Sequence, residues 1–332
     1  MPARITAAQL GLVLGLVLVP LGCGTPNPAP TGAPTSSGAS CPATAEPAPA
    51  AIPDWEPSAQ DPTVIPIFVS SSGALACGPS RFVFTLIDRQ NLPVAAPDRS
   101  ASVAFYDLGK DPGTPVATHD GTFVWAIEGA RGVYVVETSF TSSGLWGAEF
   151  KTAAPGAPSE TIRAQFEVRP APLVVSVGER APASDTLTLA DVGGDVTRIS
   201  TDPRPVQAFY QTSIADAVAA RKPFALVFAT PKFCASAQCG PTLDRIKPIA
   251  AAHPELTVIN VEPYELQNVD GQLQPVLTDG SLTPTAATNE WRLLSEPWVF
   301  VVDGSGVVRG SFEGIFGDEE LERSIAAVIP AS

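Results

Sequence analysis

The 35 prolines of this 332-residue chain are unevenly distributed, and their distribution constrains the fold more than any other feature. They cluster outside the apolar runs, above all within residues 24–62 and again within residues 170–205. Proline lacks a backbone N–H and fixes its φ angle, so these stretches are expected to be connecting segments. We therefore expect a multidomain protein, with one domain over residues 63–168, a connector over residues 169–205 and a second domain over residues 206–330.

Residues 1–23 have the organisation of an export signal. Arg4 precedes an apolar stretch over residues 10–19, which is shorter than the about 20 residues that span a membrane. The segment closes with residues 20–23, Pro-Leu-Gly-Cys, and resembles a bacterial lipoprotein signal. That resemblance implies cleavage, a diacylated Cys23 and a protein anchored on the extracytoplasmic face of the cell membrane. The alternative is an ordinary secretory signal in which Cys23 is incidental.

Residues 24–62 are rich in Pro, Ala, Thr, Ser and Gly and have almost no large apolar side chains. Such a segment cannot offset the entropy cost of ordering, so we expect a disordered tether. The net charge of −14 repels phosphate groups, which excludes nucleic acid as an expected partner.

The cysteine count favours two disulfides. Removal of Cys23 leaves an even number of cysteines in an oxidising compartment, where disulfides persist. Cys234 and Cys239 are close in sequence, which leaves Cys41 and Cys77 as a candidate structural disulfide between the tether and the first domain. This second pairing rests on counting alone.

Residues 63–168 contain short alternating runs, rich in β-branched and aromatic residues, between turn residues. This pattern predicts an antiparallel β-sandwich in which Trp125, Tyr134 and Trp146 are aromatic residues of the core or its rim and not a binding platform. The stretch over residues 132–150 resembles the closing strands of immunoglobulin-like domains of exported bacterial proteins. The predicted strands are residues 81–87, 101–106, 123–127, 132–138, 144–150 and 162–168.

The hydrophobic period changes beyond residue 206. Residues 213–221 are typical of a helix capped by Ser213, and residues 224–229 form a nearly continuous apolar run that predicts a strand buried on both faces. A helix, a second buried strand at 256–261, a polar interruption at 264–285 and a short helix at 289–294 follow. A hairpin is expected around residues 303–306, and a final helix carries Leu321 and Ile325 on one face.

This order of elements resembles the thioredoxin fold over roughly residues 206–330. The residues that carry the resemblance are the strand at 224–229, the cysteine segment at 230–241 directly after it, and Ser-Glu-Pro-Trp at 295–298, where thioredoxins have a cis-proline. The resemblance implies an α/β fold with a mixed sheet flanked by helices, and a cis Pro297 beside the cysteines. It also implies a thiol–disulfide oxidoreductase that acts on protein thiols and disulfides in the cell envelope, without cofactor or metal.

The cysteine spacing departs from that family. Thioredoxins have two residues between the cysteines, whereas here four residues separate Cys234 from Cys239. Residues five apart in one helix rise about 7.5 Å and face different directions, so one cysteine must lie off the helix. Proline is tolerated in the first turn of a helix, and Pro241 therefore predicts a helix that begins near Gly240. Cys239 is then at the positive helix end, where its thiolate is stabilised, and Cys234 is in the preceding loop.

Several alternatives remain open for this pair. Some peroxiredoxins have a resolving cysteine five residues after the peroxidatic one, a register that makes Cys234 the nucleophile. Copper-delivery proteins of the same fold use two cysteines and a distant histidine, but His253 is expected at the far end of a helix from the cysteines. A third alternative is that the pair forms a structural disulfide in a redox-inactive binding or scaffold protein. Glu296 before Pro297 favours this alternative, because a carboxylate repels thiolates.

Overall fold

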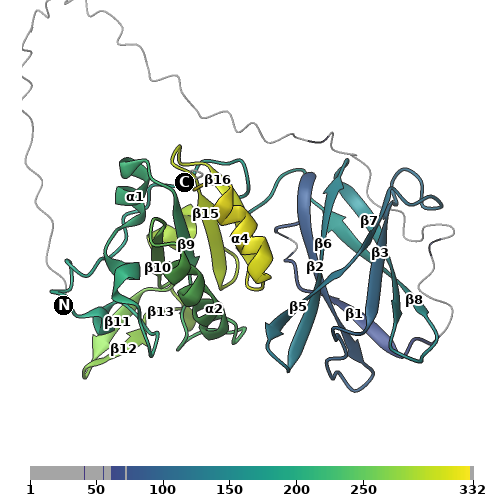
Figure 1. The fold of residues 1–332 in the computed structure, drawn as a ribbon, viewed down its shortest axis with the longest axis horizontal. Coiled ribbons are helices and arrows are strands. Elements are labelled where there is room, and N and C mark those ends of the chain that lie inside the picture. Colours follow the sequence, from purple (N-terminus) through teal and green to yellow (C-terminus); the bar gives the residue numbers. More distant parts are fainter. Residues whose placement is uncertain (1–40, 42–54, 56–60, 72, 330–332) are drawn as a thin grey trace, which may run out of the picture. The chain divides into compact units, whose positions relative to one another are not determined.

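The computed structural model describes residue 41, residue 55, residues 61–71 and residues 73–329 (Figure 1). The expected signal segment over residues 1–23, including Cys23, lies outside these residues, as does most of the expected tether. Within the described residues, no helix is long and apolar enough to cross a membrane.

Two four-stranded antiparallel sheets occupy residues 64–168. Alternate side chains of β2, β3, β6, β7 and β8 point into one shared core, so the two sheets pack face to face as a β-sandwich. That core is strongly aromatic, as in the edge-to-face pair of Phe140 and Trp146 at 4.9 Å between ring centroids. The first sheet has the order β1 (Val64–Phe68), β2 (Gly78–Asp88), β6 (Arg131–Phe140), β5 (Thr122–Ile127), and the second β4 (Ala117–Asp120), β3 (Ser100–Asp107), β7 (Gly144–Ala153), β8 (Glu160–Val168).

Two residues of the expected tether are attached to the sandwich. Cys41 forms the predicted disulfide with Cys77, with 5.8 Å between their Cα atoms. Trp55 is 3% exposed, its ring centroid lies 4.6 Å from that of Tyr106, and a Cβ at position 147 would lie 2.3 Å from its ring. Gly147 therefore leaves the space that Trp55 fills. The expectation of a tether without buried apolar side chains is wrong at residue 55.

A third four-stranded sheet lies in the C-terminal half and is buried on both faces. One face packs against α2 and α4 (Figure 1), and the opposite face packs against α1 and α3. The strand order is β10 (Thr257–Val261), β9 (Phe224–Phe228), β15 (Trp298–Val302), β16 (Val308–Glu313). The helices are α1 (Ile214–Ala220), α2 (Cys239–Ala252), α3 (Ala286–Glu290) and α4 (Asp318–Ala326), and the 3-10 turns are η1 (Val196–Arg198) and η2 (Gln207–Tyr210).

The predicted α/β thioredoxin-like fold class is wrong for this structure. An α/β fold is built from parallel strands joined by helical crossovers, and β9 with β10 is the one parallel ladder among the described strands. The remaining named strands pair antiparallel, in five separate sheets, and α1 and α3 have only 7 and 5 residues. Buried apolar runs in the sequence indicate that strands are covered on both faces, but they do not specify strand direction or the number of sheets.

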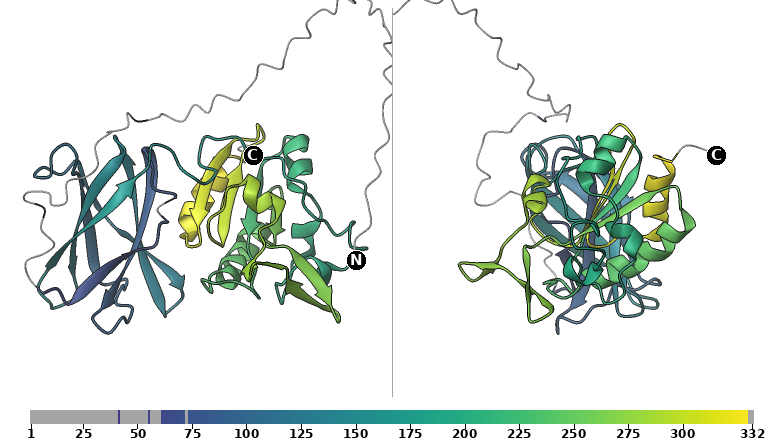
Figure 2. Two further views of the ribbon diagram at one scale, coloured as in Figure 1. Left: turned by 180° about the vertical axis from the view of Figure 1, so that it is seen from behind. Right: turned by 90° about the vertical axis from the view of Figure 1, so that its left-hand side faces the viewer.

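The polar stretch over residues 264–285, expected to interrupt the fold, instead forms two small hairpins. They project from the C-terminal body that contains the sheet of β9, β10, β15 and β16 (Figure 2). Each turns at an Asp-Gly pair in which both residues have positive φ, namely Asp270-Gly271 and Asp279-Gly280. Two positive φ angles are what a tight hairpin turn requires, and Asp-Gly is a favoured pair for it. The strands are β11 (Leu266–Val269), β12 (Gln272–Pro275), β13 (Leu277–Thr278) and β14 (Ser281–Leu282).

The expected connector over residues 169–205 contributes to the C-terminal cores. Val174 and Val175 pack with the side chains of α1 and α3, whereas Leu189 and Val196 pack with those of α2. Despite its prolines, this segment is an integral part of the fold that follows it.

Candidate active site

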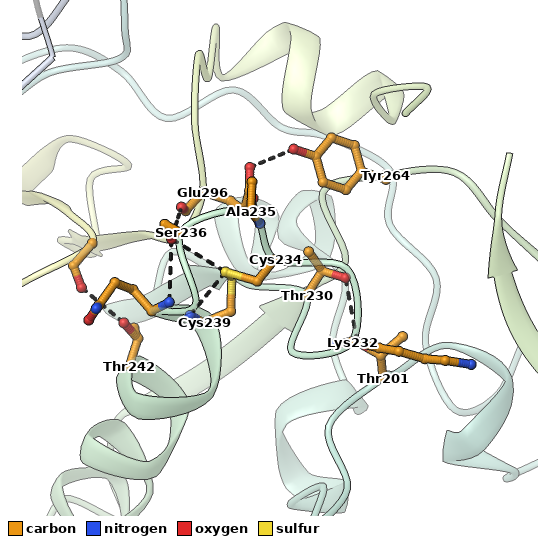
Figure 3. Close-up of a disulfide and its surroundings, with 12 residues drawn as sticks. Thr201, Thr230, Lys232, Cys234, Ala235, Ser236, Cys239, Thr242, Tyr264 and Glu296 are labelled. Carbon is orange, nitrogen blue, oxygen red and sulfur yellow. Dashed lines mark hydrogen bonds between the residues drawn. A yellow bond between two sulfur atoms is a disulfide. The ribbon is translucent and has the colours of Figure 1, made fainter. Parts of the chain in front are cut away.

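The cysteine pair lies where β9 leads into α2. Cys239 is the first residue of α2, Pro241 lies in its first turn, and Cys234 lies in the preceding loop, as the sequence predicts. Ala237 has a positive φ of 59°, so the loop turns back and brings Cys234 over the start of the helix. The two cysteines form a disulfide with 6.1 Å between their Cα atoms (Figure 3).

The two cysteines differ in exposure and in hydrogen bonding. Cys239 is 0% exposed, whereas Cys234 is only partly buried. The backbone N–H of Cys239 donates to Cys234 Sγ at 3.2 Å, and Ser236 Oγ lies 3.4 Å from the same sulfur. Negative charge on Cys234 would therefore face the first N–H of α2, which stabilises a thiolate. The sequence leaves open which cysteine is the nucleophile, with Cys239 a candidate at the helix end, whereas in the structure it is Cys234 Sγ that accepts from the first N–H of α2.

Glu296 and Pro297 meet the cysteine loop in space. The Glu296–Pro297 peptide bond is cis, as predicted, and both residues are buried. The backbone N–H of Ala235 donates to Glu296 Oε1 at 2.9 Å, and Ser236 Oγ donates to the Glu296 carbonyl oxygen at 3.0 Å. The segment before β15 and the loop before α2 are thus directly bonded, and Glu296 points toward the disulfide (Figure 3).

Tyr264 completes this arrangement from the other side of Glu296. Its hydroxyl donates to Glu296 Oε2, and burial together with that carboxylate raises the pKa of the phenol. Sequence reasoning missed this role, because Tyr264 opens the stretch that was expected to be a polar interruption. The available signal was its position three residues after the strand expected at residues 256–261, since residues that follow a strand lie at the end of that strand.

Three potential metal ligands converge here. The Sγ atoms of Cys234 and Cys239 and a carboxylate oxygen of Glu296 all lie within 4.8 Å of one another. Both histidines of the chain are elsewhere: His253 is the C-cap of α2, at the opposite end from Cys239, and His119 is in β4. His253 Nε2 is 2.7 Å from a carboxylate oxygen of Glu322, a contact that raises its pKa. The histidine ligand of the copper-delivery alternative is therefore missing from this site.

Lysine at the edge of the site does not neutralise it. Lys232 Nζ donates to the carbonyl oxygen of Leu273 at 2.9 Å, and its side chain points away from the sulfurs (Figure 3). The two donors to the Glu296 carboxylate, Ala235 N–H and Tyr264 O–H, are both uncharged. Glu296 is thus a carboxylate held by neutral partners beside two sulfur atoms.

Comparison with known proteins gives no family. No family model matches the chain, and no curated protein matches it. A DUF4426 family protein from Pseudomonas aeruginosa PAO1 is 16% identical with a TM-score of 0.24, over 32% of this chain and 90% of that one. The PmoD soluble domain from Methylocystis sp. is 16% identical with a TM-score of 0.20, over 28% of this chain and 74% of that one. MtrC from Shewanella baltica OS185 is 13% identical with a TM-score of 0.23, over 43% of this chain and 27% of that one. At these TM-scores the likenesses identify neither a fold nor a function for this chain.

Proposed function

We propose that the Cys234–Cys239 pair exchanges disulfides with partner proteins, with Cys234 as the sulfur that the partner contacts. The observation that carries the proposal is the difference in exposure between the two cysteine residues, because a nucleophile must reach the cysteine that it attacks. Cys239, which is fully buried, then serves as the resolving cysteine within the protein.

The exchange balances in either direction. When the protein oxidises a partner, a partner thiolate attacks Cys234 Sγ, forms a mixed disulfide and releases Cys239 as a thiolate. A second partner thiolate attacks the partner's sulfur in that mixed disulfide, which yields the partner disulfide and a Cys234 thiolate facing the Cys239 N–H. When the protein reduces a partner, the same steps run in reverse and Cys234 attacks first.

The test is a trapping experiment with an insulin-reduction assay. Cys239→Ser is expected to accumulate a mixed disulfide between Cys234 and the substrate, because the resolving thiol is missing. Cys234→Ser is expected to trap nothing, and both variants should lose turnover. The double variant Cys41→Ala/Cys77→Ala is the matched control and should keep activity, since it removes the other disulfide.

A redox titration of the Cys234–Cys239 disulfide can exclude the proposal. If the Cys234–Cys239 disulfide stays oxidised well below about −300 mV, it belongs to the structural class and does not exchange.

The buried Glu296 carboxylate favours a second candidate function. A carboxylate beside the sulfurs opposes the thiolate form, which suits a redox-inactive scaffold whose disulfide only ties the loop to α2. Unchanged insulin reduction rates in the absence and presence of the protein would favour this candidate over exchange.

We propose further that the protein is exported and anchored to the outer face of the cell membrane through lipid on Cys23. The signal-like segment over residues 1–23 and the Cys41–Cys77 disulfide support an oxidising compartment. Cys23→Ala is expected to move the protein from the membrane fraction to the soluble fraction or to block its processing. An unmodified mature N-terminus at another residue, found by mass spectrometry, contradicts the anchor.

A further inference from the structure

The site has a feature that disulfide exchange does not use. Glu296 is 8% exposed, yet its carboxylate lies within 4.8 Å of both sulfurs and is held there by two hydrogen bonds. An ionised carboxylate in such a place is costly unless a positive charge or strong donors compensate for it.

Reduction of the disulfide changes the donor groups of this site. A dithiol reductant supplies two electrons and two protons, becomes a disulfide itself and leaves Cys234 and Cys239 as thiols. The two separated sulfurs and the Glu296 carboxylate are then three neighbouring donor groups, and neither hydrogen-bond donor to that carboxylate is a cation. Such a donor set suits a divalent metal ion, to which a thiol binds with loss of its proton.

We propose that the reduced form binds one Zn²⁺ ion through Cys234 Sγ, Cys239 Sγ and a Glu296 carboxylate oxygen. Binding displaces two protons from the thiols and leaves a site with three protein ligands. The inference requires that the pair can be reduced, but it does not require exchange with a partner protein.

The ligand geometry is compatible with a tetrahedral ion. Zinc takes thiolate sulfur at about 2.3 Å and carboxylate oxygen at about 2.0–2.2 Å, which separates tetrahedral ligands by roughly 3.5–3.8 Å. The three atoms already lie within 4.8 Å of one another. Once the S–S bond is broken, rotation of the partly exposed Cys234 side chain separates the sulfurs to the distance that an ion needs.

The hydrogen bonds to Glu296 hold its carboxylate in one orientation, as the neighbours of a metal ligand do. Ala235 N–H holds Oε1 and Tyr264 O–H holds Oε2, so the carboxylate orientation is fixed before any metal arrives. Each carboxylate oxygen has a second lone pair for a metal. Partners of this kind orient ligands in known metal sites, and their loss costs about 10–100-fold in affinity.

The test is metal binding by the full chain, prepared without oxygen after reduction by a phosphine. The probes are Zn²⁺, titrated in competition with a chromogenic chelator, and Co²⁺, whose visible spectrum reports tetrahedral thiolate coordination. We expect one tight zinc per reduced chain, none at this site in the oxidised chain, and thiolate-to-metal bands with Co²⁺. Cys41→Ala/Cys77→Ala should bind equally well, which excludes the other cysteine pair.

Variants separate the ligands from their surroundings. Cys234→Ser, Cys239→Ser and Glu296→Gln should each weaken zinc binding by more than about 100-fold, whereas Tyr264→Phe should weaken it by about 10–100-fold and keep the Co²⁺ bands. Glu265→Gln, at an exposed neighbour of Tyr264, is the matched control and should bind as the parent does. Because Glu296 is buried, Glu296→Asp provides a second variant that keeps the charge, and it should bind more tightly than Glu296→Gln.

Equal zinc affinity of the oxidised and reduced chains, or of Glu296→Gln and Glu265→Gln, overturns the inference. The outcomes are separable from those for the proposed function. A chain that reduces insulin but binds no zinc contradicts only the metal site, and a chain that binds zinc but exchanges no disulfide contradicts only the exchange.

Discussion

The buried carboxyl group of Glu262 is expected to make the stability of this protein depend on pH. Glu262 follows β10 and is 7% exposed, and its Oε1 accepts hydrogen bonds from the backbone N–H and the hydroxyl of Thr201. Burial raises its pKa from 4.5 to about 7, because the charged form loses hydration. The folded chain therefore keeps a proton on Glu262 at pH values where the unfolded chain has released it.

Glu262→Gln should change how stability depends on pH. Between pH 4.5 and about 7 the folded parent binds more protons than the unfolded chain, so its free energy of unfolding falls as pH rises and levels off above about pH 7. The neutral Gln variant lacks this loss, and its advantage should grow with pH to roughly 3 kcal/mol. Urea unfolding at several pH values measures the difference.

Glu265→Gln serves as the matched control, since Glu265 is exposed and should not alter the slope. Parallel pH profiles for the parent and Glu262→Gln would show that Glu262 is ionised in the fold and that its burial carries no such penalty.

At the scale of elements, the sequence predicts which helices and strands form and which are buried better than it predicts which strands pair and in which direction. The strands over residues 81–87 and 144–150 and the start of α2 at Cys239 follow from alternation and from Pro241, which act through local backbone rules. Strand direction is set by partners distant in sequence, so the antiparallel character of the C-terminal half was not predictable from apolar runs.

In the candidate site, too, some residues could be predicted from the sequence and others could not. Cys234, Cys239 and the cis Pro297 are recognisable from residue type and spacing, and the structure places them together with Glu296. Tyr264 lies three residues after β10 and bridges to Pro284, and its hydrogen bond to Glu296 joins segments distant in sequence, which residue type and spacing do not indicate. The exposure of Cys234 relative to Cys239 likewise depends on packing that spacing does not specify.

The turn between β15 and β16 is an element whose sequence signal was sufficient. Asp303 accepts hydrogen bonds from the hydroxyl and the backbone N–H of Ser305, from the backbone N–H of Val307 and from the Arg309 side chain. Although partial burial acts in the opposite direction, these bonds lower the pKa of Asp303 to about 2. The Asp303 carboxylate thus accepts from backbone N–H groups within the turn itself. Because these bonds join neighbouring residues, the Asp-Gly-Ser-Gly motif alone predicts the hairpin.

For the molecule as a whole, the Cys41–Cys77 disulfide closes a loop with a sequence separation of 36 residues. In the chain-entropy treatment, a loop of that length restricts the unfolded state by roughly 4 kcal/mol. The Cys41→Ala/Cys77→Ala variant is therefore expected to unfold at lower temperature, with a loss of about 2–4 kcal/mol, in calorimetry. Cys23→Ser is the matched single-cysteine control and should leave the transition unchanged. A loss below about 0.5 kcal/mol would mean that the loop is already restricted in the unfolded chain.

The same disulfide also sets how far the protein extends from its proposed anchor. Cys41 is fixed to the sandwich, so only the 18 residues from position 23 to position 41 separate a lipid on Cys23 from the folded body. A chain of that length spans at most about 60 Å when fully extended, whereas a tether that ran to residue 62 would span roughly twice that distance. An anchored protein of this kind would stay in a thin layer above the membrane. Reduction of Cys41–Cys77 would make Trp55 the first residue held by the sandwich and so lengthen the segment between the lipid and the folded body.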